Sequence, residues 1–144
     1  MDDWKGNSRI SLEIVLTKKQ KETLANHAQS SFPNESCALL FGTDDSKTCT
    51  VKDVFLADNI EKSPINFTIS NDELLKGYKE AEQKKLDVIG IFHSHPHSEA
   101  IPSSTDREFM VGNPVIWVIF SNKYDEFRAY IQESDIVQVP VRIV

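Results

Sequence analysis

Short apolar runs of strand length recur along this chain of 144 residues, and amphipathic helical segments lie between several of them. Most of the runs alternate apolar and polar residues with the two-residue period of a half-buried strand. They lie at residues 10–16, 38–41, 51–57, 65–69, 88–92, 115–120, 127–131 and 137–143. This mixed order of strands and helices predicts an α/β or α+β fold, in which about eight strands form a mixed sheet flanked by three helices.

Two of the helices are predicted from capping signals at their first turns. Thr17 and Gln20 have the spacing of a capping box, and their helix is expected to end before Pro33. Ser103 is expected to cap a shorter helix that stops at Gly112.

The remaining helix is predicted to begin after Ser70, which stands three residues before Glu73. Its inward-facing stripe is expected to consist of Leu74, Leu75, Tyr78 and Ala81. Further along the chain, Pro140 lacks the backbone N–H of a central strand, so the last strand is expected at a sheet edge.

Length and local composition predict the domain organisation. Residues 1–8 are polar and are expected to form a loose N-terminal tail. No repeat, low-complexity tract or long Pro/Gly/Ser linker interrupts residues 9–144, which are therefore predicted to form a single domain.

The charge and cysteine content exclude several classes of protein. The chain has 22 acidic and 16 basic residues and no concentrated basic block, so no nucleic acid partner is expected. No apolar run approaches the ~20 residues of a membrane helix, and the first residues lack the apolar stretch of a secretion signal. Cys37 and Cys49 form neither a disulfide framework nor a CxxC metal knuckle, which favours a cytoplasmic protein.

Three of the four histidines lie within five residues, in the segment His93-Ser94-His95-Pro96-His97. This segment follows the apolar run at 88–92 directly. Residues two apart in extended backbone face the same side, so His93 and His95 are expected to project together from the end of a central strand. Two neighbouring imidazoles suit a zinc ion. His97 is instead expected in a solvated loop.

Asp106 is the predicted third ligand. With Ser103 as N-cap, Asp106 occupies the third helical position, where the helix dipole favours a carboxylate. His93, His95 and Asp106 would leave one tetrahedral position open for a bound water, whose pKa zinc lowers to ~7. The sequence therefore predicts one Zn²⁺ per chain.

Hydrolysis at such a site also requires a general base. Glu35 is the candidate because it precedes the apolar run at 38–41, which is expected to lie beside the histidine strand. Spacing alone does not single it out among 22 acidic residues. Cys37 is expected to be a packed thiol rather than a nucleophile, and His27 is expected to be structural.

Each feature has an ordinary explanation when taken alone. An isolated His-x-His is more often a pair of unrelated histidines, and Ser103-x-x-Asp106 alone is only a capping box. Their combination after an apolar strand favours a metal site. Other His-x-His enzymes fit less well, because the chain lacks the Asp-His pair of metallo-β-lactamases and the P-C-x-x-C of zinc deaminases. Too little chain follows His95 for an amidohydrolase barrel of ~250 residues.

Together these residues resemble the motif of the JAMM (MPN-plus) metallopeptidase family. Two segments carry the resemblance: residues 34–42, which include Glu35, and the strand predicted at 88–92 with the His-Ser-His-Pro that follows it. The spacing also matches, because ten residues separate His95 from Asp106 and Ser103 stands three residues before that aspartate. The order of elements also matches from about residue 10 to residue 131.

The resemblance implies a cytidine-deaminase-like fold and a role for each residue of the motif. His93, His95 and Asp106 would bind zinc, Glu35 would activate the water, and Ser103 would donate a hydrogen bond to the oxyanion. The implied activity is a zinc isopeptidase that cleaves ubiquitin or ubiquitin-like modifier conjugates after the C-terminal Gly-Gly. Two alternatives stay open: a JAMM hydrolase acting on sulfur-carrier tails or small amino-acid conjugates, and a non-catalytic MPN scaffold.

Overall fold

The structure is a computed structural model that describes residues 12–144. The predicted tail at 1–8 and the first two residues of the strand predicted at 10–16 lie outside the described residues. The strands are β1 (Glu13–Leu16), β2 (Cys37–Asp44), β3 (Thr48–Ala57), β4 (Asp87–His95), β5 (Ile116–Ser121), β6 (Glu126–Gln132), β7 (Ile136–Val139) and β8 (Val141–Ile143). The helices are α2 (Lys18–Ser31), α3 (Asn71–Gln83) and α4 (Ser104–Gly112).

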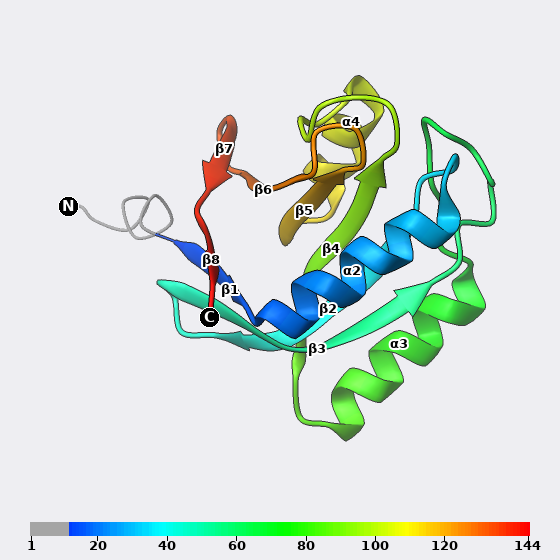
Figure 1. The fold of residues 1–144 in the computed structure, drawn as a ribbon. Helices are drawn as coiled ribbons and strands as arrows, with labels where there is room; N and C mark the ends of the chain where they lie inside the picture. Colours follow the sequence, from blue (N-terminus) through cyan, green and yellow to red (C-terminus); the bar gives the residue numbers. More distant parts are fainter. Residues whose placement is uncertain (1–11) are drawn as a thin grey trace.

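All eight strands belong to one mixed sheet with the order β7-β6-β5-β4-β2-β3-β1-β8 (Figure 1). β4 pairs antiparallel with β2 and parallel with β5, so it lies in the middle of the sheet. β7 and β8 lie at opposite ends of this order although only Pro140 separates them in the chain. The sheet therefore curls strongly, because a single residue joins its two edges.

Helices cover both faces of the sheet. On one face α2 buries Leu24 and Ala28 against the side chains of Leu40, Phe92 and Val118. The opposite face is covered by α3, whose Ala81 packs with Leu39 and Phe41, and by α4. The predicted mixed α/β fold is confirmed, and residues 12–144 contain eight strands and three helices.

The predicted helix starts are also present. Thr17 caps α2 in a full capping box with Gln20, and Ser103 caps α4 in the same way with Asp106. Ser70 accepts a hydrogen bond from the backbone N–H of Glu73 at the start of α3. These caps satisfy donors that have no partner inside the helix.

The expected inward stripe of α3 was wrong in part. Leu75 is 66% exposed and Tyr78 is 57% exposed. The buried face is centred instead on Gly77 and Ala81. Gly77 faces the side chain of Leu39 so closely that a Cβ at this position would lie 2.6 Å from its Cδ1. The small residues Gly77 and Ala81 let α3 approach the sheet closely. The large side chains of Leu75 and Tyr78 therefore lie at the exposed edge of the contact.

The strand predicted at 65–69 was also wrong. This segment does not join the sheet, because its hydrogen bonds go to residues 59–63. Asn59 accepts from the N–H of Thr68 and donates to the carbonyl of Asn66. The part of the chain that the structure describes nevertheless has eight strands, because Pro140 divides the predicted last strand into β7 and β8.

Among residues 12–144, no helix is long and apolar enough to cross a membrane.

Candidate active site

Strand β4 carries His93 and His95 at its C-terminal end, on the sheet face that α3 and α4 cover. His93 lies opposite Cys37 of β2 and beside Ile119 of β5. The strand is therefore hydrogen-bonded on both sides, and both imidazoles are buried. A paired central strand gives the two rings a rigid base.

The first turn of α4 brings Asp106 to the same place. Asp106 Oδ2 accepts a hydrogen bond from the backbone N–H of Ser103 at 2.9 Å, as the capping box requires. The same oxygen lies 3.1 Å from His93 Nε2 and 3.1 Å from His95 Nε2. The helix cap therefore orients the carboxylate toward both rings.

The three polar atoms form a nearly equilateral triangle, because the two Nε2 atoms are 3.2 Å apart. Three atoms each ~2.0 Å from a tetrahedrally coordinated zinc ion would be separated by ~3.3 Å. The observed edges are close to that value. The geometry and the donor set of two imidazoles and one carboxylate both fit zinc.

Hydrogen bonding around His95 supports the same fit. Its Nδ1 lies 2.8 Å from the carbonyl oxygen of Glu99 and must donate, because a carbonyl only accepts. In the neutral ring, Nε2 then presents a lone pair toward the lone pairs of Asp106 Oδ2. One proton can bridge only one pair of these atoms, whereas a cation inside the triangle attracts all three.

Aromatic side chains enclose His93. The ring of Phe67 stacks on it with centroids 4.8 Å apart, and Trp117 packs edge-on at 5.9 Å. His93 Nδ1 is buried and has no hydrogen-bond partner among the described residues. Packing rather than a hydrogen bond therefore holds the Nδ1 side of this ring, while Nε2 faces Asp106.

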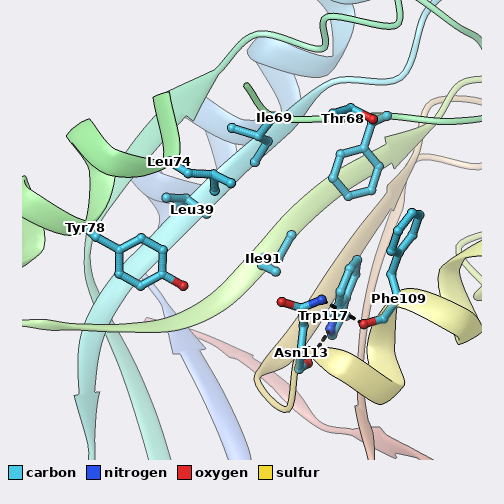
Figure 2. A pocket seen from close by; sticks show the side chains of 10 residues that line it. Leu39, Thr68, Ile69, Leu74, Tyr78, Ile91, Phe109, Asn113 and Trp117 are labelled. Carbon is cyan, nitrogen blue, oxygen red and sulfur yellow. Dashed lines mark hydrogen bonds between the residues drawn. The ribbon is translucent and has the colours of Figure 1, made fainter. Parts of the chain in front are cut away.

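The same two aromatic residues line a cleft of about 240 Å³ beside the histidines (Figure 2). The cleft runs between α3, the segment 67–69, β4 and α4, and its walls are mostly apolar. Its lining residues are Leu39, Phe67, Thr68, Ile69, Leu74, Tyr78, Ile91, Phe109, Asn113 and Trp117.

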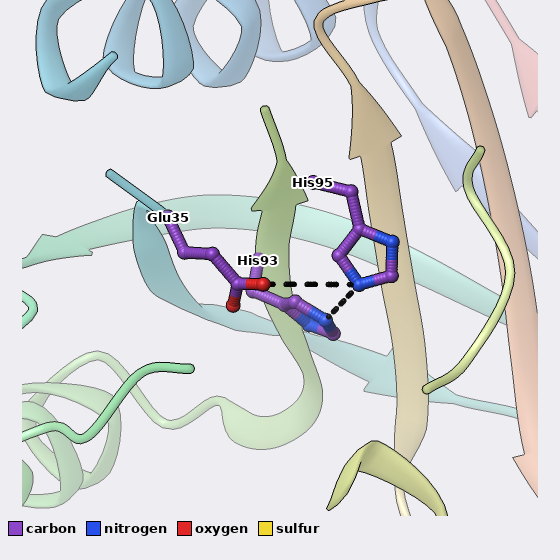
Figure 3. Close-up of side chains that lie close together, drawn as sticks. All are labelled: Glu35, His93 and His95. Carbon is purple, nitrogen blue, oxygen red and sulfur yellow. Dashed lines mark hydrogen bonds and ion pairs between the residues drawn. The ribbon is translucent and has the colours of Figure 1, made fainter. Parts of the chain in front are cut away.

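Glu35 reaches the site from the segment just before β2. Its carboxylate points toward the two histidines (Figure 3), and Oε2 lies 4.0 Å from His95 Nε2. The side chain is buried, and Oε1 has no hydrogen-bond partner among the described residues. Burial raises the pKa of Glu35 to about 8. A carboxyl group with such a pKa can both take and return a proton near neutral pH.

The environment perturbs the other ionisable groups in opposite directions. Burial alone would raise the pKa of Asp106, but hydrogen bonds from His93 and His95 hold it well below its usual range. Burial lowers the pKa of His93. Burial also opposes protonation of His95, but Asp106 and the Glu99 carbonyl outweigh it and raise the pKa of this ring. Asp106 is therefore the permanent anion of the site.

Two carboxylates flank the histidine pair, and their distances distinguish them. Ligand atoms of Glu35, His93 and His95 lie within 4.8 Å of one another, so Glu35 could itself hold a metal ion. Asp106 is closer, at 3.1 Å from both rings, while Glu35 is 4.0 Å from His95. Asp106 is therefore both closer to the two rings and more acidic than Glu35.

Ser103 stands beside Asp106 at the N-cap of α4. Its hydroxyl oxygen accepts the backbone N–H of Asp106 at 3.1 Å. Accepting this bond leaves the hydroxyl proton available, so the capping bond and hydrogen-bond donation to a substrate are compatible.

The remaining sequence candidates have structural surroundings. Burial raises the pKa of Cys37 to about 12, so its thiol is a packed core group. His27 Nε2 lies 3.0 Å from the Cys37 carbonyl and 3.1 Å from that of Ala57, which is a structural contact. His97 is exposed and packs edge-on against Phe32.

Sequence reasoning missed several groups that shape the site. Phe67 was assigned to a strand, Trp117 to a buried strand, and the Glu99 carbonyl carries no signal in its residue type.

Fold and site together define a class of mixed α/β proteins whose central sheet presents a group of side chains that could hold a metal ion. Residues 17–132 match the family described as prokaryotic homologs of the JAB domain. The chain belongs to this family, a member of the JAMM/MPN group.

Two characterised relatives and one solved structure support this placement. A desampylase from Pyrococcus furiosus is 41% identical over 102 residues, which cover 71% of this chain and 69% of the relative. A CysO-cysteine peptidase from Mycobacterium tuberculosis is 27% identical over 135 residues, 91% of each chain. A solution structure of a Desulfitobacterium hafniense protein has a TM-score of 0.83 and 28% identity, covering 91% of this chain and 92% of that one.

Proposed function

We propose that this protein is a zinc-dependent isopeptidase that cleaves ubiquitin-like modifier conjugates after the C-terminal Gly-Gly of the modifier. The observation that carries the proposal is the triangle of His93, His95 and Asp106, with a buried glutamate beside it. These three residues would hold the metal. Zinc, when bound, would supply a Lewis acid and an activated water.

Glu35 would act as general base and then as general acid. It would take the proton of the attacking water and return it to the leaving amine. Its position 4.0 Å from His95 Nε2 supports this role, and so does its buried Oε1, which has no hydrogen-bond partner within residues 12–144.

Ser103 would donate its hydroxyl proton to the oxyanion of the tetrahedral intermediate. The backbone N–H of Asp106 already occupies one lone pair of this hydroxyl and fixes its orientation. Donors of this kind are worth on the order of 3 kcal/mol in other acyl-transfer enzymes.

The substrate class is argued from the cleft and from the relatives. A flexible modifier tail could lie in the apolar cleft beside His93. The cleft would accommodate the side chains of the tail residues other than glycine. The names of the relatives, a desampylase and a CysO-cysteine peptidase, favour small modifier or sulfur-carrier conjugates. The net charge of −6 gives no support to a nucleic acid partner, and the two buried cysteines agree with a cytoplasmic location.

A second candidate substrate is a sulfur-carrier protein that bears a single amino acid at its C-terminus. The mycobacterial CysO-cysteine peptidase favours it, because the match spans 91% of both chains. Incubation with a modifier joined to a lysine side chain and with a carrier joined to cysteine separates the two. Turnover of the cysteine conjugate alone would favour the second candidate.

The variant Glu35→Gln tests the mechanism. It keeps the size of the side chain but cannot take a proton, so we expect one zinc per chain by metal analysis and a loss of kcat of at least ~100-fold. Glu22→Gln, an exposed change on α2, is the matched control and should leave kcat unchanged. Full activity of Glu35→Gln would remove Glu35 from the mechanism. A wild-type chain that neither holds zinc nor hydrolyses any conjugate would point to a non-catalytic scaffold.

A further inference from the structure

Ser94 stands between the two histidines, but its side chain lies on the opposite face of β4. Alternation along the strand places His93 and His95 on the face of α3 and α4, and Ser94 with Phe92 on the face of α2. Ser94 is fully buried. Its hydroxyl therefore cannot contact the proposed metal ligands or a substrate directly.

The Ser94 hydroxyl continues the pairing of β4 with the chain before β2. The ladder register pairs Cys37 with His93, which places Ser36 opposite Ser94 and Glu35 opposite His95. At this rung the Ser94 N–H donates to the Ser36 carbonyl at 3.1 Å. The return bond is unusual, because the Ser36 N–H donates to the Ser94 hydroxyl at 2.8 Å rather than to a carbonyl. The two hydroxyls also lie 2.9 Å apart.

The backbone of Glu35 is held on its other side by the loop between β3 and α3. The Glu35 N–H donates to the Ser63 carbonyl at 2.8 Å, and the Glu35 carbonyl accepts from Asn59 Nδ2 at 3.0 Å. Neither bond reaches β4. Within residues 12–144, every hydrogen bond shown between segment 34–36 and β4 involves Ser94.

We propose that Ser94 is a positioning residue that fixes the Glu35 carboxylate relative to His93 and His95. The Ser36–Ser94 rung is the direct link between the base segment and the strand that carries the histidines. Without the Ser94 hydroxyl, the buried Ser36 N–H loses its acceptor. The position of Glu35 is then set by its bonds to Ser63 and Asn59 in the loop rather than by β4. The proposal rests on the proposed function, in which a proton must pass between Glu35 and a water held near the histidines.

The test compares Ser94→Ala with Ser36→Ala in the full chain at saturating zinc. Ser94→Ala removes the acceptor of the Ser36 N–H, so kcat should fall about tenfold to a hundredfold, as for other misplaced catalytic groups. One zinc per chain and a KM within about twofold of wild type are expected, because ligands and cleft are untouched. Ser36→Ala keeps the N–H bond and loses only the contact between hydroxyls, so kcat should stay within about fivefold of wild type.

A second readout does not depend on catalysis. Amide hydrogen exchange of Ser36 in the metal-free protein should accelerate at least about tenfold in Ser94→Ala, and it should stay protected in Ser36→Ala. Val139→Ala, a buried change in β7, is the control for a general loss of stability and should leave kcat unchanged. If Val139→Ala lowered kcat as much as Ser94→Ala, the effect would be structural and the proposal would fail.

The outcomes separate this proposal from the proposed function. Unchanged kcat in Ser94→Ala, or a loss that appears only in zinc content or KM, would overturn the positioning role. Unchanged protection of the Ser36 amide would overturn it independently. A wild-type chain without hydrolysis of any conjugate would instead refute the proposed function, while the exchange measurement would still decide whether Ser94 fixes segment 34–36.

Discussion

At the scale of single residues, the site places one strongly acidic and one weakly acidic carboxyl beside the same pair of rings. Asp106 shares one oxygen with both imidazoles, whereas Glu35 touches neither closely and is buried without a full set of partners. The difference in contacts sets their pKa values apart. Such a separation supports the proposed roles of Asp106 as ligand and Glu35 as base.

The buried Glu35 carboxyl should make the stability of the metal-free protein depend on pH. Its pKa is about 8 in the folded chain and 4.5 ordinarily. From pH 4.5 to 8 the unfolded state releases this proton while the folded state keeps it, so the group lowers stability as pH rises. Glu35→Gln carries no such proton. With chelator present, the free energy of unfolding of the variant, relative to that of wild type, should therefore increase by up to about 4 kcal/mol as the pH rises from 5 to 8.

Denaturant unfolding at the two pH values measures this gain. Glu22→Gln, which changes an exposed carboxyl, should show none of it. A gain for Glu35→Gln that is the same at pH 5 and pH 8 would contradict a raised pKa. Saturating zinc should reduce the effect, because a nearby cation favours the carboxylate.

At the scale of elements, one capping box both caps helix α4 and orients the Asp106 carboxylate toward the histidines. Ser103 satisfies the N–H of Asp106, and the Asp106 carboxylate returns the bond to the Ser103 N–H while facing the histidines. α2 has the same device in Thr17 and Gln20, far from the site. The two caps are therefore a natural matched pair.

Ser103→Ala and Thr17→Ala should each destabilise the fold by about 0.5–2 kcal/mol, the usual cost of losing an N-cap. Only Ser103→Ala should also lower zinc affinity, by about tenfold or more, because its cap orients a ligand. It should lower kcat by about 100-fold to 1,000-fold as well. Zinc competition assays, kinetics and denaturant unfolding measure the three effects. Equal kinetic losses in both variants would show that Ser103 acts through stability alone.

At the scale of the whole molecule, the site joins segments that are far apart in the chain. Glu35 precedes β2, the histidines end β4 and Asp106 opens α4, while the apolar cores lie on both sheet faces. These cores do not include the ligands, so the fold is expected to persist without metal. We keep as a prediction that residues 9–144 form one domain.

Zinc should nevertheless stabilise the protein, because its ligands converge only in the folded chain. At a free concentration 100 times the Kd, binding adds about 2.7 kcal/mol. For a chain of this length that corresponds to a rise in Tm of roughly 5–10 °C. Thermal unfolding with chelator and with zinc measures the shift. Asp106→Asn should unfold cooperatively but show a much smaller shift, and an equal shift would place the metal elsewhere.

Much of this architecture could be read from local sequence, because the signals involved act over a few residues. The capping boxes at Thr17 and Ser103 and the period of β4 depend only on neighbouring residues, and all three are present in the structure. The sequence by itself thus determined the class of fold, the common face of His93 and His95, and the place of Asp106 in its helix.

Only the tertiary structure decided which elements meet. The segment 65–69 alternates like a strand but pairs with no strand of the described residues, because its hydrogen bonds go to Asn59, Ile60 and Ser63. α3 turns its small residues rather than Leu75 to the sheet. The pairing of β2 with β4 brings Glu35, one of 22 acidic residues, beside the histidines. Such contacts depend on the packing of distant segments, and no local pattern of residues encodes that packing.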